Sequence, residues 1–440
     1  PAAWVARERI VASTAPALVQ GRLTHRPILL RGYLASDGER VDVLPGGLAR
    51  ASGAMGSNAF SPRHGGVAKD VWIVHERTLE PRPTVLQADF LDPAPLLGVP
   101  SRVAENLFWL GRYGERAEVA LRLFREFLVL RSEETGLPAE ERHYCQARIL
   151  ATFTHVTGTY PGFAGPRGWD GADPAPELRS ALLDTRRPGS LVFSLRAMMQ
   201  STLSVRDRLS SDTWEVVDGL SRVLERLEQL REPELATVFW ETRPLLQGLT
   251  AFSGLTWENM YRDLGWRFLD LGRRLERAMY LLRLLETALE RPAEEASEKA
   301  MLERLLALND SLAAFRMRFR TRLTPETVLE KLLQDDTDPR AVVYQLIRLE
   351  RHAEQVPRGP HVTLYRTALG RVVLESLAAT RLADPVALAV VDPATGRREG
   401  LLALTARIRQ LLPLFSDTAS NSYFRHADPP HHLFRSGGVG

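Results

Sequence analysis

The sequence of 440 residues predicts a mainly α-helical fold, in which a duplicated helical bundle follows a small β-rich (α+β) segment. From Ser101 almost to the end, apolar residues recur at three- and four-residue spacing, the pattern of helices that bury one face. Before residue 77, apolar residues instead form short runs bounded by Gly, Pro, Ser and Asp, which is typical of strands and turns. An internal repeat predicts that the helical part is built twice.

The β-rich segment spans residues 1–76. Two glycine-containing stretches in it, PGGLAR (45–50) and GGVAKD (65–70), predict turns beside strands, with Arg50 and Lys69 nearby. Glycine backbone together with a cation suits contact with phosphate, although most such turns only connect strands. The apolar runs that predict strands are WVARERIV (4–11), PILLRGYLA (27–35), VDVLPGGLA (41–49) and KDVWIVHE (69–76).

Three segments follow the β-rich part. Residues 77–100 hold five prolines and little periodicity, which predicts a linker. The helical region extends over 101–426, and a flexible tail over 427–440. The first helix is expected to have Ser101 at its N-cap, since serine side chains often accept the first free backbone N–H groups of a helix.

The internal repeat is clearest around a Glu-Arg pair. LGRYGERAEVALRL (110–123) matches LGRRLERAMYLLRL (271–284) at a constant offset of 161 residues. The matches predict a duplicated unit of about 150 residues, with halves at about 101–235 and 255–425. Two weaker pairs follow in the same order: RPGSLVFSL (187–195) with DPRAVVYQL (338–346), and LSSDT (209–213) with LFSDT (414–418).

Each copy of the repeated helix places an Arg, a Glu three residues later and an Arg four residues later on one helix face. The glycine before the first Arg, Gly111 or Gly272, removes a side chain and would let another helix approach, at a cost in helix propensity of up to about 1 kcal/mol. The candidate site residues in this region are Glu105, Arg112, Glu115, Arg116, Arg273, Glu276 and Arg277.

Two interpretations of these motifs remain open. In the structural one, Glu and Arg form ion pairs that lock the two halves around a pseudo-twofold axis. If those pairs are buried, loss of one partner would cost about 3–5 kcal/mol. In the functional one, the two clusters converge on a shared pocket, where arginines grip a carboxylate or phosphate and glutamates hold an amine.

Charge and composition argue against several functions. The net charge is only +3, and all but three of the 57 basic residues are arginine, a bias that more often reflects genome composition than a nucleic-acid groove. We therefore expect no nucleic-acid partner. The chain has no apolar run of eighteen residues, which predicts no membrane span.

Cysteine and histidine usage adds two expectations. Cys145 is the single cysteine, which rules out an intramolecular disulfide, suits a reducing, cytoplasmic compartment and predicts a buried, inert thiol. The tail HADPPHH (426–432) clusters histidines without helical spacing, so we expect no metal site there. The sequence shows no recognisable catalytic triad.

The helical region resembles a known family. SRVAENLFWLGRYGERAE (101–118) is similar to the signature of the alpha-E family, helical proteins named for their Glu-Arg motif. The resemblance covers about 101–426 and departs from stand-alone members at MMQSTL before Val205 and at Arg187-Pro188, where the family has Asn-Pro. Other matching stretches are GWRFLDLGRRLERA (265–278), SVRDRLSSDTW (204–214) and SDTASNSYFRH (416–426).

The first 80 residues resemble the end of circularly permuted ATP-grasp proteins. WVARE (4–8), LLRGYL, LPGGLAR and GGVAKDVW match that family's later motifs in order, with Arg7 where the family has Gln. The resemblance implies Mg-ATP binding and activation of a carboxylate as an acyl phosphate for attack by an amine. It also implies that most of the ATP site lies in an N-terminal ATP-grasp portion upstream of this chain. Candidates for nucleotide or substrate contact are Glu8, Arg31, Arg50 and Lys69.

Three functions are compatible with this sequence. In the first, the complete protein is an ATP-dependent carboxylate–amine ligase, and the helical region binds a peptide, amino acid or amine, or scaffolds the assembly. The 440-residue chain alone would then be inactive. In the second, the helical region is itself catalytic through Glu115 and Glu276. In the third, the helical region is an oligomerisation module, and the motifs only stabilise its interior. The protein could then form a homo-oligomer. A polar pocket containing both motifs would favour the first two.

Overall fold

The computed structural model forms two compact units, one within residues 1–93 and one within 94–440. The N-terminal segment 4–11, Glu8, most of the linker and the tail lie outside the described residues. The structure describes residues 12–19, 22–36, 41–54, 60, 66–72, 98–132, 136–165, 169, 171–357 and 366–424.

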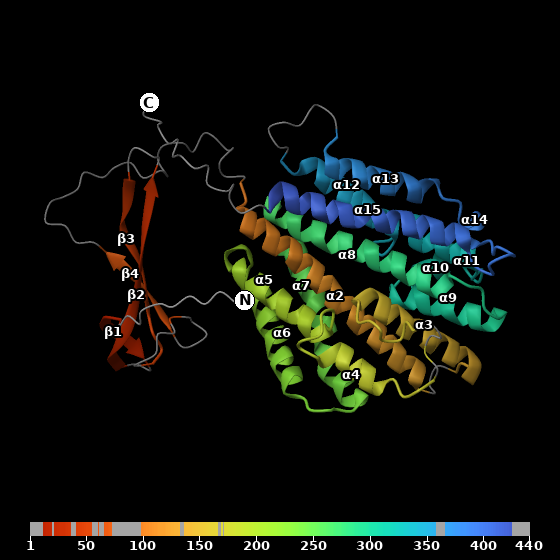
Figure 1. The fold of residues 1–440 in the computed structure, drawn as a ribbon, viewed down its shortest axis with the longest axis horizontal. Helices are drawn as coiled ribbons and strands as arrows, with labels where there is room; N and C mark the ends of the chain where they lie inside the picture. The colour runs from red at the N-terminus through yellow and green to blue at the C-terminus, as the bar shows by residue number, and fades with distance from the viewer. Residues whose placement is uncertain are drawn as a thin grey trace, which may run out of the picture. The chain divides into compact units, whose positions relative to one another are not determined.

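The first unit contains an antiparallel sheet with the strand order β1-β2-β3-β4 (Figure 1). The apolar runs predicted at 27–35 and 41–49 lie in its second and third strands, and the run beginning at residue 69 lies partly in its fourth. The sequence pattern thus located the second and third strands and part of the fourth, but it did not predict β1. Their bounds are β1 Thr14–Val19, β2 Arg22–Ser36, β3 Val41–Ala51 and β4 Val67–Trp72.

The turn predicted at PGGLAR (45–50) is wrong, because this stretch lies within strand β3. A Cβ atom on Gly47 would lie 2.6 Å from the carbonyl oxygen of Arg31, and one on Gly46 would lie 3.1 Å from that of Val71. The glycines therefore let the backbones of neighbouring strands approach, which is a second common use of glycine in a strand.

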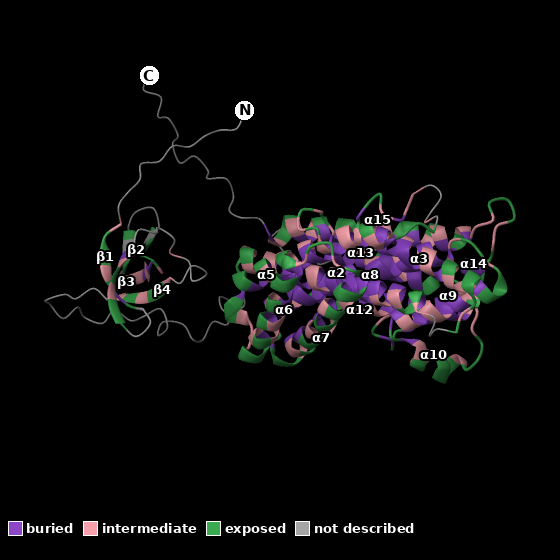
Figure 2. Ribbon diagram, turned by 90° about the horizontal axis from the view of Figure 1, so that it is seen from below, coloured by how far each residue is buried: buried purple, intermediate pink, exposed green. Residues whose placement is uncertain are grey.

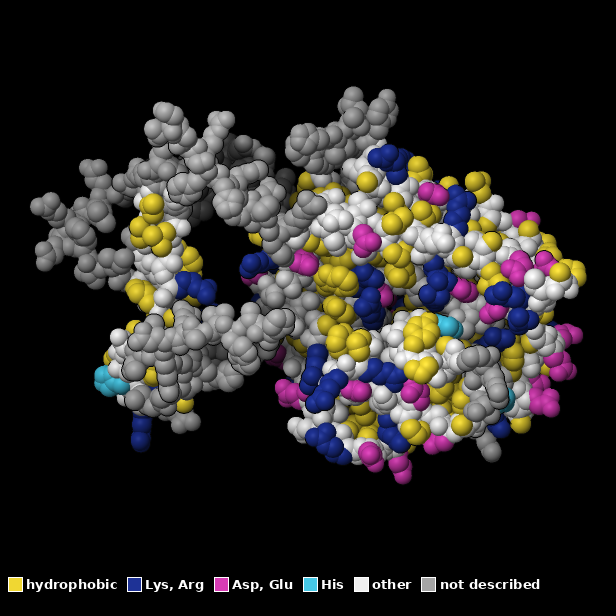
Figure 3. Space-filling view, viewed as in Figure 1, with side chains coloured by type: hydrophobic (Ala, Val, Ile, Leu, Met, Phe, Trp, Pro, Cys, Tyr) yellow, Lys and Arg dark blue, Asp and Glu magenta, His cyan; other side chains and the backbone are white. Residues whose placement is uncertain are grey.

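Apolar side chains are exposed on both faces of this sheet. Leu29 and Leu30 are consecutive in β2 and so point to opposite faces, yet they are 49% and 59% exposed. Tyr33 and Leu34 repeat the pattern at 45% and 69%. Figure 3 shows hydrophobic side chains on the surface of this unit. Apolar sheet faces of this kind normally pack against another layer of structure.

The second unit is a bundle of helices around two long central ones, α2 and α8, which run side by side in the same direction (Figure 1). Its helices are α2 Ser101–Arg131, α3 Ala139–Thr157, α4 Ala175–Leu183, α5 Leu191–Ser204, α6 Ser211–Gln229, α7 Leu235–Asn259, α8 Leu264–Leu289, α9 Glu295–Leu308, α10 Leu312–Phe319, α11 Pro325–Leu329, α12 Val342–Gln355, α13 Ala368–Leu382, α14 Pro385–Ala389 and α15 Glu399–Tyr423, with a 3₁₀ turn at Arg206–Arg208 and a π-helical turn at Glu330–Gln334.

The surrounding helices pack in similar ways on the two central ones. Helix α2 packs against α5 and α8 packs against α12, while α6 pairs with α7 and α13 pairs with α15. Figure 2 shows that the buried residues of this unit gather along α2 and α8. The two helices that carry the predicted Glu-Arg motifs therefore form the core of the bundle.

Two predicted helix boundaries need correction. Ser101 is the first residue of α2, and Pro100 is its N-cap, with the Pro100 carbonyl accepting from the N–H of Val103 at 2.8 Å. Helix α7 runs through residues 235–255, the interval expected between the two halves, and contains Pro244. Proline usually breaks helices because it lacks an N–H, but α7 continues through Pro244 and joins the interval to the bundle.

Only one of the two weaker repeat pairs occupies equivalent positions in the structure. Leu191 and Val342, which are aligned in the second pair, each begin a helix, α5 and α12. In the third pair, Ser210 of LSSDT is the N-cap of α6, whereas LFSDT lies in the middle of α15. The third pair therefore does not mark equivalent positions.

Cys145 lies in α3 and is fully buried, as expected for an inert thiol. Burial raises the pKa of its thiol to about 12. Within the described residues, no helix combines the length and the apolar character that crossing a membrane requires.

Candidate functional site

The two Glu-Arg motifs meet where α2 and α8 pack together. The carboxylate of Glu115 on α2 accepts two hydrogen bonds from Arg277 on α8, from Nε at 2.8 Å and from Nη2 at 2.5 Å. The Nε of Arg273, one turn earlier on α8, lies 3.8 Å from the same carboxylate. Glu115 is therefore held by both arginines of the opposite motif.

The second glutamate is held in the reciprocal way. Glu276 on α8 accepts hydrogen bonds from the Nε atoms of Arg112 at 2.6 Å and Arg116 at 2.8 Å, both on α2. Each motif thus supplies two arginines to the glutamate of the other. We call these residues the ER network: Arg112, Glu115, Arg116, Arg273, Glu276 and Arg277.

Two glycines allow the helices to come this close. A Cβ atom on Gly111 would lie 2.1 Å from the carbonyl oxygen of Leu269, and one on Gly272 would lie 2.0 Å from that of Phe108. Backbone contact between helices is feasible only where a side chain is missing. The glycine that precedes each first arginine therefore sets the spacing at which the ER network forms.

The ER network is buried, except that the Arg116 side chain is 34% exposed. Burial by itself raises the pKa of Glu276, but the charges of Arg112 and Arg116 outweigh it and hold that pKa below its ordinary value. Burial opposes the charge of Arg277, yet its contact with Glu115 raises the pKa of Arg277. Glu276 is consequently ionised at neutral pH.

Further charged residues that the sequence analysis did not single out surround the ER network. Glu118 contacts Arg122 at 2.9 Å and Arg340 at 2.8 Å, and Asp270 contacts Arg274 at 3.1 Å. Glu118–Arg122 and Asp270–Arg274 have i,i+4 spacing, a signal that could have been noticed. Arg340 lies far along the chain and gave no such signal.

Two hydroxyl groups on outer helices complete the arrangement. Arg112 donates from Nη1 to Oγ of Ser416 on α15 at 3.0 Å, and Arg273 donates from Nη2 to Oγ1 of Thr256 on α7 at 3.3 Å. The first arginine of each motif is therefore oriented by a helix outside the central pair.

Comparison with known proteins agrees with this architecture. Residues 99–424 match the Alpha-E family, described as a predicted alpha-helical domain with a conserved ER motif. The chain belongs to the Alpha-E family. Residues 101–426 had been expected to form this domain, and the match covers nearly the same range.

Several mycobacterial proteins that are named only as uncharacterised proteins are similar to this Alpha-E protein. One from Mycobacterium tuberculosis is 31% identical over 81% of this chain and 41% of its own length, so this chain spans about two-fifths of that relative. Another from the same organism is 38% identical over 18% of this chain and 14% of its own length. A protein of Mycobacterium leprae is 38% identical over 17% of this chain and 13% of its own length. No solved structure matches the chain significantly.

A small pocket of about 140 Å³, with both charged and apolar residues in its wall, adjoins the ER network of the Alpha-E domain. Glu115, Arg116 and Glu276, which come from both motifs, line it. The pocket is also lined by Tyr280, whose buried hydroxyl has no hydrogen-bond partner in the described structure, and by His155, whose pKa is lowered by burial and by nearby arginine. Residues of both motifs thus line one small pocket.

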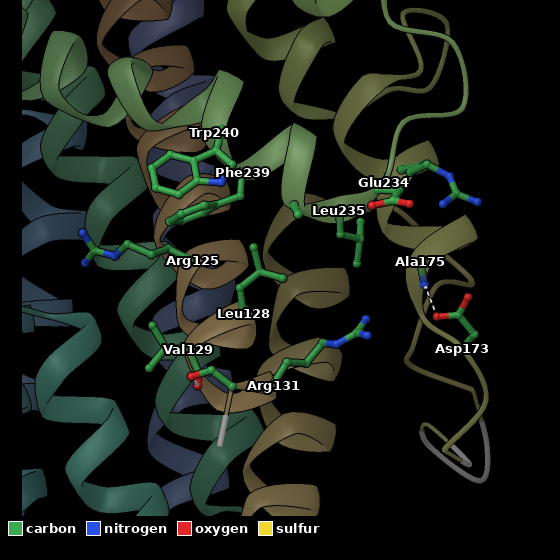
Figure 4. Close-up of a pocket in the computed structure, with 13 residues that line it drawn as sticks. Arg125, Leu128, Val129, Arg131, Asp173, Ala175, Glu234, Leu235, Phe239 and Trp240 are labelled. Atoms are coloured by element: carbon green, nitrogen blue, oxygen red, sulfur yellow. Dashed lines mark hydrogen bonds between the residues drawn. The ribbon is translucent and has the colours of Figure 1, made fainter. Parts of the chain in front are cut away.

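A larger pocket of about 620 Å³ lies elsewhere in the Alpha-E domain and contains no residue of the ER network. Figure 4 shows Val129 and Arg125 of α2 facing Phe239 and Trp240 of α7 across it. Trp240 is 61% exposed. Because this pocket gathers no buried charge, we take the ER network and its surroundings as the candidate site.

The other predicted site residues are distributed more widely. Glu105 is half-buried in α2, seven residues before Arg112 and outside the ER network as defined. In the sheet, Arg31 pairs with Leu48 and Lys69 pairs with Ala49. Since paired residues share a face, Arg31 and Arg50 lie on one face and Lys69 on the other.

The separated Lys69 has a partner of its own, because its ammonium group donates to the carbonyl oxygen of Pro16. Glu8 lies outside the described residues. Among the side chains that the structure describes, no group of three or more His, Cys, Asp or Glu is arranged to hold a metal ion.

The buried carboxylates predict that acid destabilises the protein. Despite burial, neighbouring arginines hold the pKa values of Glu118, Asp270 and Glu276 below their ordinary values. A group whose pKa is depressed on folding stabilises the fold above its unfolded pKa, about 4, and loses that contribution as pH falls further. We expect the free energy of unfolding from urea titrations to fall steeply below about pH 4 as these carboxylates become protonated. Constant stability down to pH 2 would contradict the assignment of these carboxylates as paired and ionised.

Proposed function

We propose that this chain is part of an ATP-dependent ligase that joins a carboxylate to an amine, and that its Alpha-E domain binds a substrate of that reaction. The observation that carries the proposal is the small pocket formed jointly by both motifs, with Glu115, Arg116 and Glu276 in its wall. In this view the ATP-grasp portion, whose end corresponds to residues 1–76, uses ATP and Mg²⁺ for the chemistry.

Binding is a better role for the ER network than catalysis. A general acid or base must change its protonation state near neutral pH. Glu276 is held ionised by two arginines, and Glu115 is fixed by two others. Such glutamates can hold the surrounding arginine side chains in fixed orientations. The network is therefore preorganised to bind a ligand.

The charges favour a substrate with a carboxylate over a bare ammonium group. The ER network contains four arginines and two glutamates, so it has a net positive charge. Arg116, the partly exposed member, also lines the pocket. An arginine in that position can bind a carboxylate in fork geometry, as in recognition of an amino acid or peptide.

Two features of the first unit support an ATP-grasp origin. Its sheet exposes apolar residues on both faces, as expected of a sheet that belongs to a larger, layered domain. Arg31 and Arg50 share one face, which suits contact with a nucleotide or substrate anion. The rest of that domain would be the upstream portion of the same polypeptide. ATP use and a reduced Cys145 would both suit a cytoplasmic protein.

We also propose that the Alpha-E domain arose by duplication. The reciprocal bonds of the ER network relate α2 to α8, and the paired helix starts at Leu191 and Val342 relate α5 to α12. Ser416 and Thr256 bind the equivalent arginines and so relate α15 to α7. The first half would then extend to about residue 260 and include α7.

The ligase proposal is tested by ATP turnover. We expect the protein expressed from its complete reading frame to form ADP from Mg-ATP only when both a carboxylate and an amine substrate are supplied, and the 440-residue chain to form none. ADP release and amide formation are measured over a panel of amino acids and short peptides. Turnover by the 440-residue chain, or no substrate-dependent turnover by the complete protein, would overturn the proposal.

A further inference from the structure

Another cavity, of about 340 Å³, lies between α7, α8 and the start of α12. Three arginines of α8, Arg273, Arg274 and Arg277, line it together with Arg340, which precedes α12. Glu118 is the carboxylate in its wall. The volume lies in the range of small-molecule sites, about 300–1,000 Å³.

The carboxylates behind this wall are shared among several cations. Glu115 bonds Arg277 directly, whereas its distance to Arg273 Nε is 3.8 Å, beyond a hydrogen bond. Asp270 bonds Arg274 but also His352, at 2.8 Å. Guanidinium groups thus outnumber carboxylates around the cavity, and Arg273 is the one without a carboxylate at bonding distance.

Two of the arginines that line the cavity are affected by this excess of positive charge. Burial and neighbouring arginines together lower the pKa of Arg273 and of Arg340. Both groups stay charged, since arginine titrates far above neutral pH. An anion in the cavity would reduce the repulsion between them.

Aromatic rings fix the orientation of further guanidinium groups here. Arg274 lies over the ring of Tyr344 at 5.6 Å, and Arg348 lies over that of Trp257 at 5.2 Å. The Nε atom of Arg348 is buried and has no hydrogen-bond partner among the described residues. Arg348 does not line the cavity, but through Trp257 it adds a positive charge beside it.

The α7 side of the cavity leaves room for a ligand. Thr250, Gly254 and Trp257 line it from one face of the helix. A Cβ atom on Gly254 would meet no atom within 4 Å, so a larger side chain there would extend into open space in the cavity.

We infer that this cavity binds the oxyanion group, carboxylate or phosphate, of a small ligand, with Arg273 and Arg340 as its principal donors. A planar guanidinium group offers paired N–H donors that match either oxyanion. The inference rests on the proposed function only for the idea that the ligand is a ligase substrate. Binding itself requires neither ATP nor turnover.

The test is calorimetric titration of the 440-residue chain with inorganic phosphate and with succinate in a low-chloride buffer. Gly254→Leu fills the cavity without removing a charge, and Arg340→Gln removes a donor. Gly219→Leu is the matched control, because Gly219 is also a helical glycine with no atom within 4 Å of a Cβ, but lies on α6. We expect affinity to fall about tenfold or more in the first two variants and to be unchanged in the control.

Each outcome decides between alternatives. Binding of phosphate without succinate assigns the cavity to a phosphate group, and binding of succinate without phosphate assigns it to a carboxylate. No binding of either at millimolar concentration, or equal affinity in folded Gly254→Leu, overturns the inference. These titrations and the turnover assay of the complete protein can fail independently.

Discussion

Replacing Glu115 by glutamine is expected to lower the free energy of unfolding by about 3–5 kcal/mol, because it leaves Arg273 and Arg277 buried without their carboxylate. The Glu115 side chain is only 2% exposed, so water cannot replace the lost charge. Glu276→Gln should cost less, since one of its partners, Arg116, is 34% exposed and can be hydrated. Urea denaturation followed by circular dichroism measures both values.

A surface pair provides the control for this comparison. Glu228 contacts Arg196 at 2.6 Å, but their side chains are 27% and 49% exposed. Exposed pairs of this kind contribute about 0–1 kcal/mol, so Glu228→Gln should change stability by no more than that. If Glu115→Gln proved as mild as Glu228→Gln, the ER network would not be what holds α2 and α8 together.

Local sequence patterns explain which parts of the fold could be predicted. The helix around Arg112 and the one around Arg273 were found because periodicity and the repeat are visible in short stretches. Helix α7 contains Pro244, and tertiary packing keeps the helix continuous where propensity alone predicts a break. The turn predicted from the glycines at residues 45–50 was wrong for a similar reason. These glycines permit close contact between strands and do not form a turn.

The candidate site shows a similar limit. The repeat identified Arg112, Glu115 and their counterparts, but not which residue each would bind, because the partners lie on the other helix, some 160 residues away. Arg340 and Thr256 come from still other helices or loops, and only the fold brings them to α8. Sequence spacing therefore reveals residues of one helix face, while the pocket beside them depends on tertiary structure.

Gly111→Ala and Gly272→Ala are each expected to destabilise the protein by about 3 kcal/mol or more, the upper end of overpacking. The added methyl groups would lie 2.1 and 2.0 Å from backbone carbonyl oxygens of the opposite helix, and backbone cannot rotate away as a side chain can. In isolation, alanine would favour the helix by about 1 kcal/mol, so the observed loss understates the cost of separating the helices. Thermal and urea unfolding measure the effect.

Alanine substitutions at two other helical glycines distinguish the effect of helix packing from the effect of helix propensity. A Cβ atom on Gly219 or Gly254 meets nothing within 4 Å, so Gly219→Ala and Gly254→Ala should leave stability unchanged or raise it by up to about 1 kcal/mol. The double variant of Gly111 and Gly272 should cost less than the sum of the single ones, since either substitution already moves α2 away from α8. If the losses of unfolding free energy in the two single variants added up in the double variant, the two glycine contacts would be independent. If the single losses were no larger than that of Gly219→Ala, close approach of α2 and α8 would not be what positions the ER network.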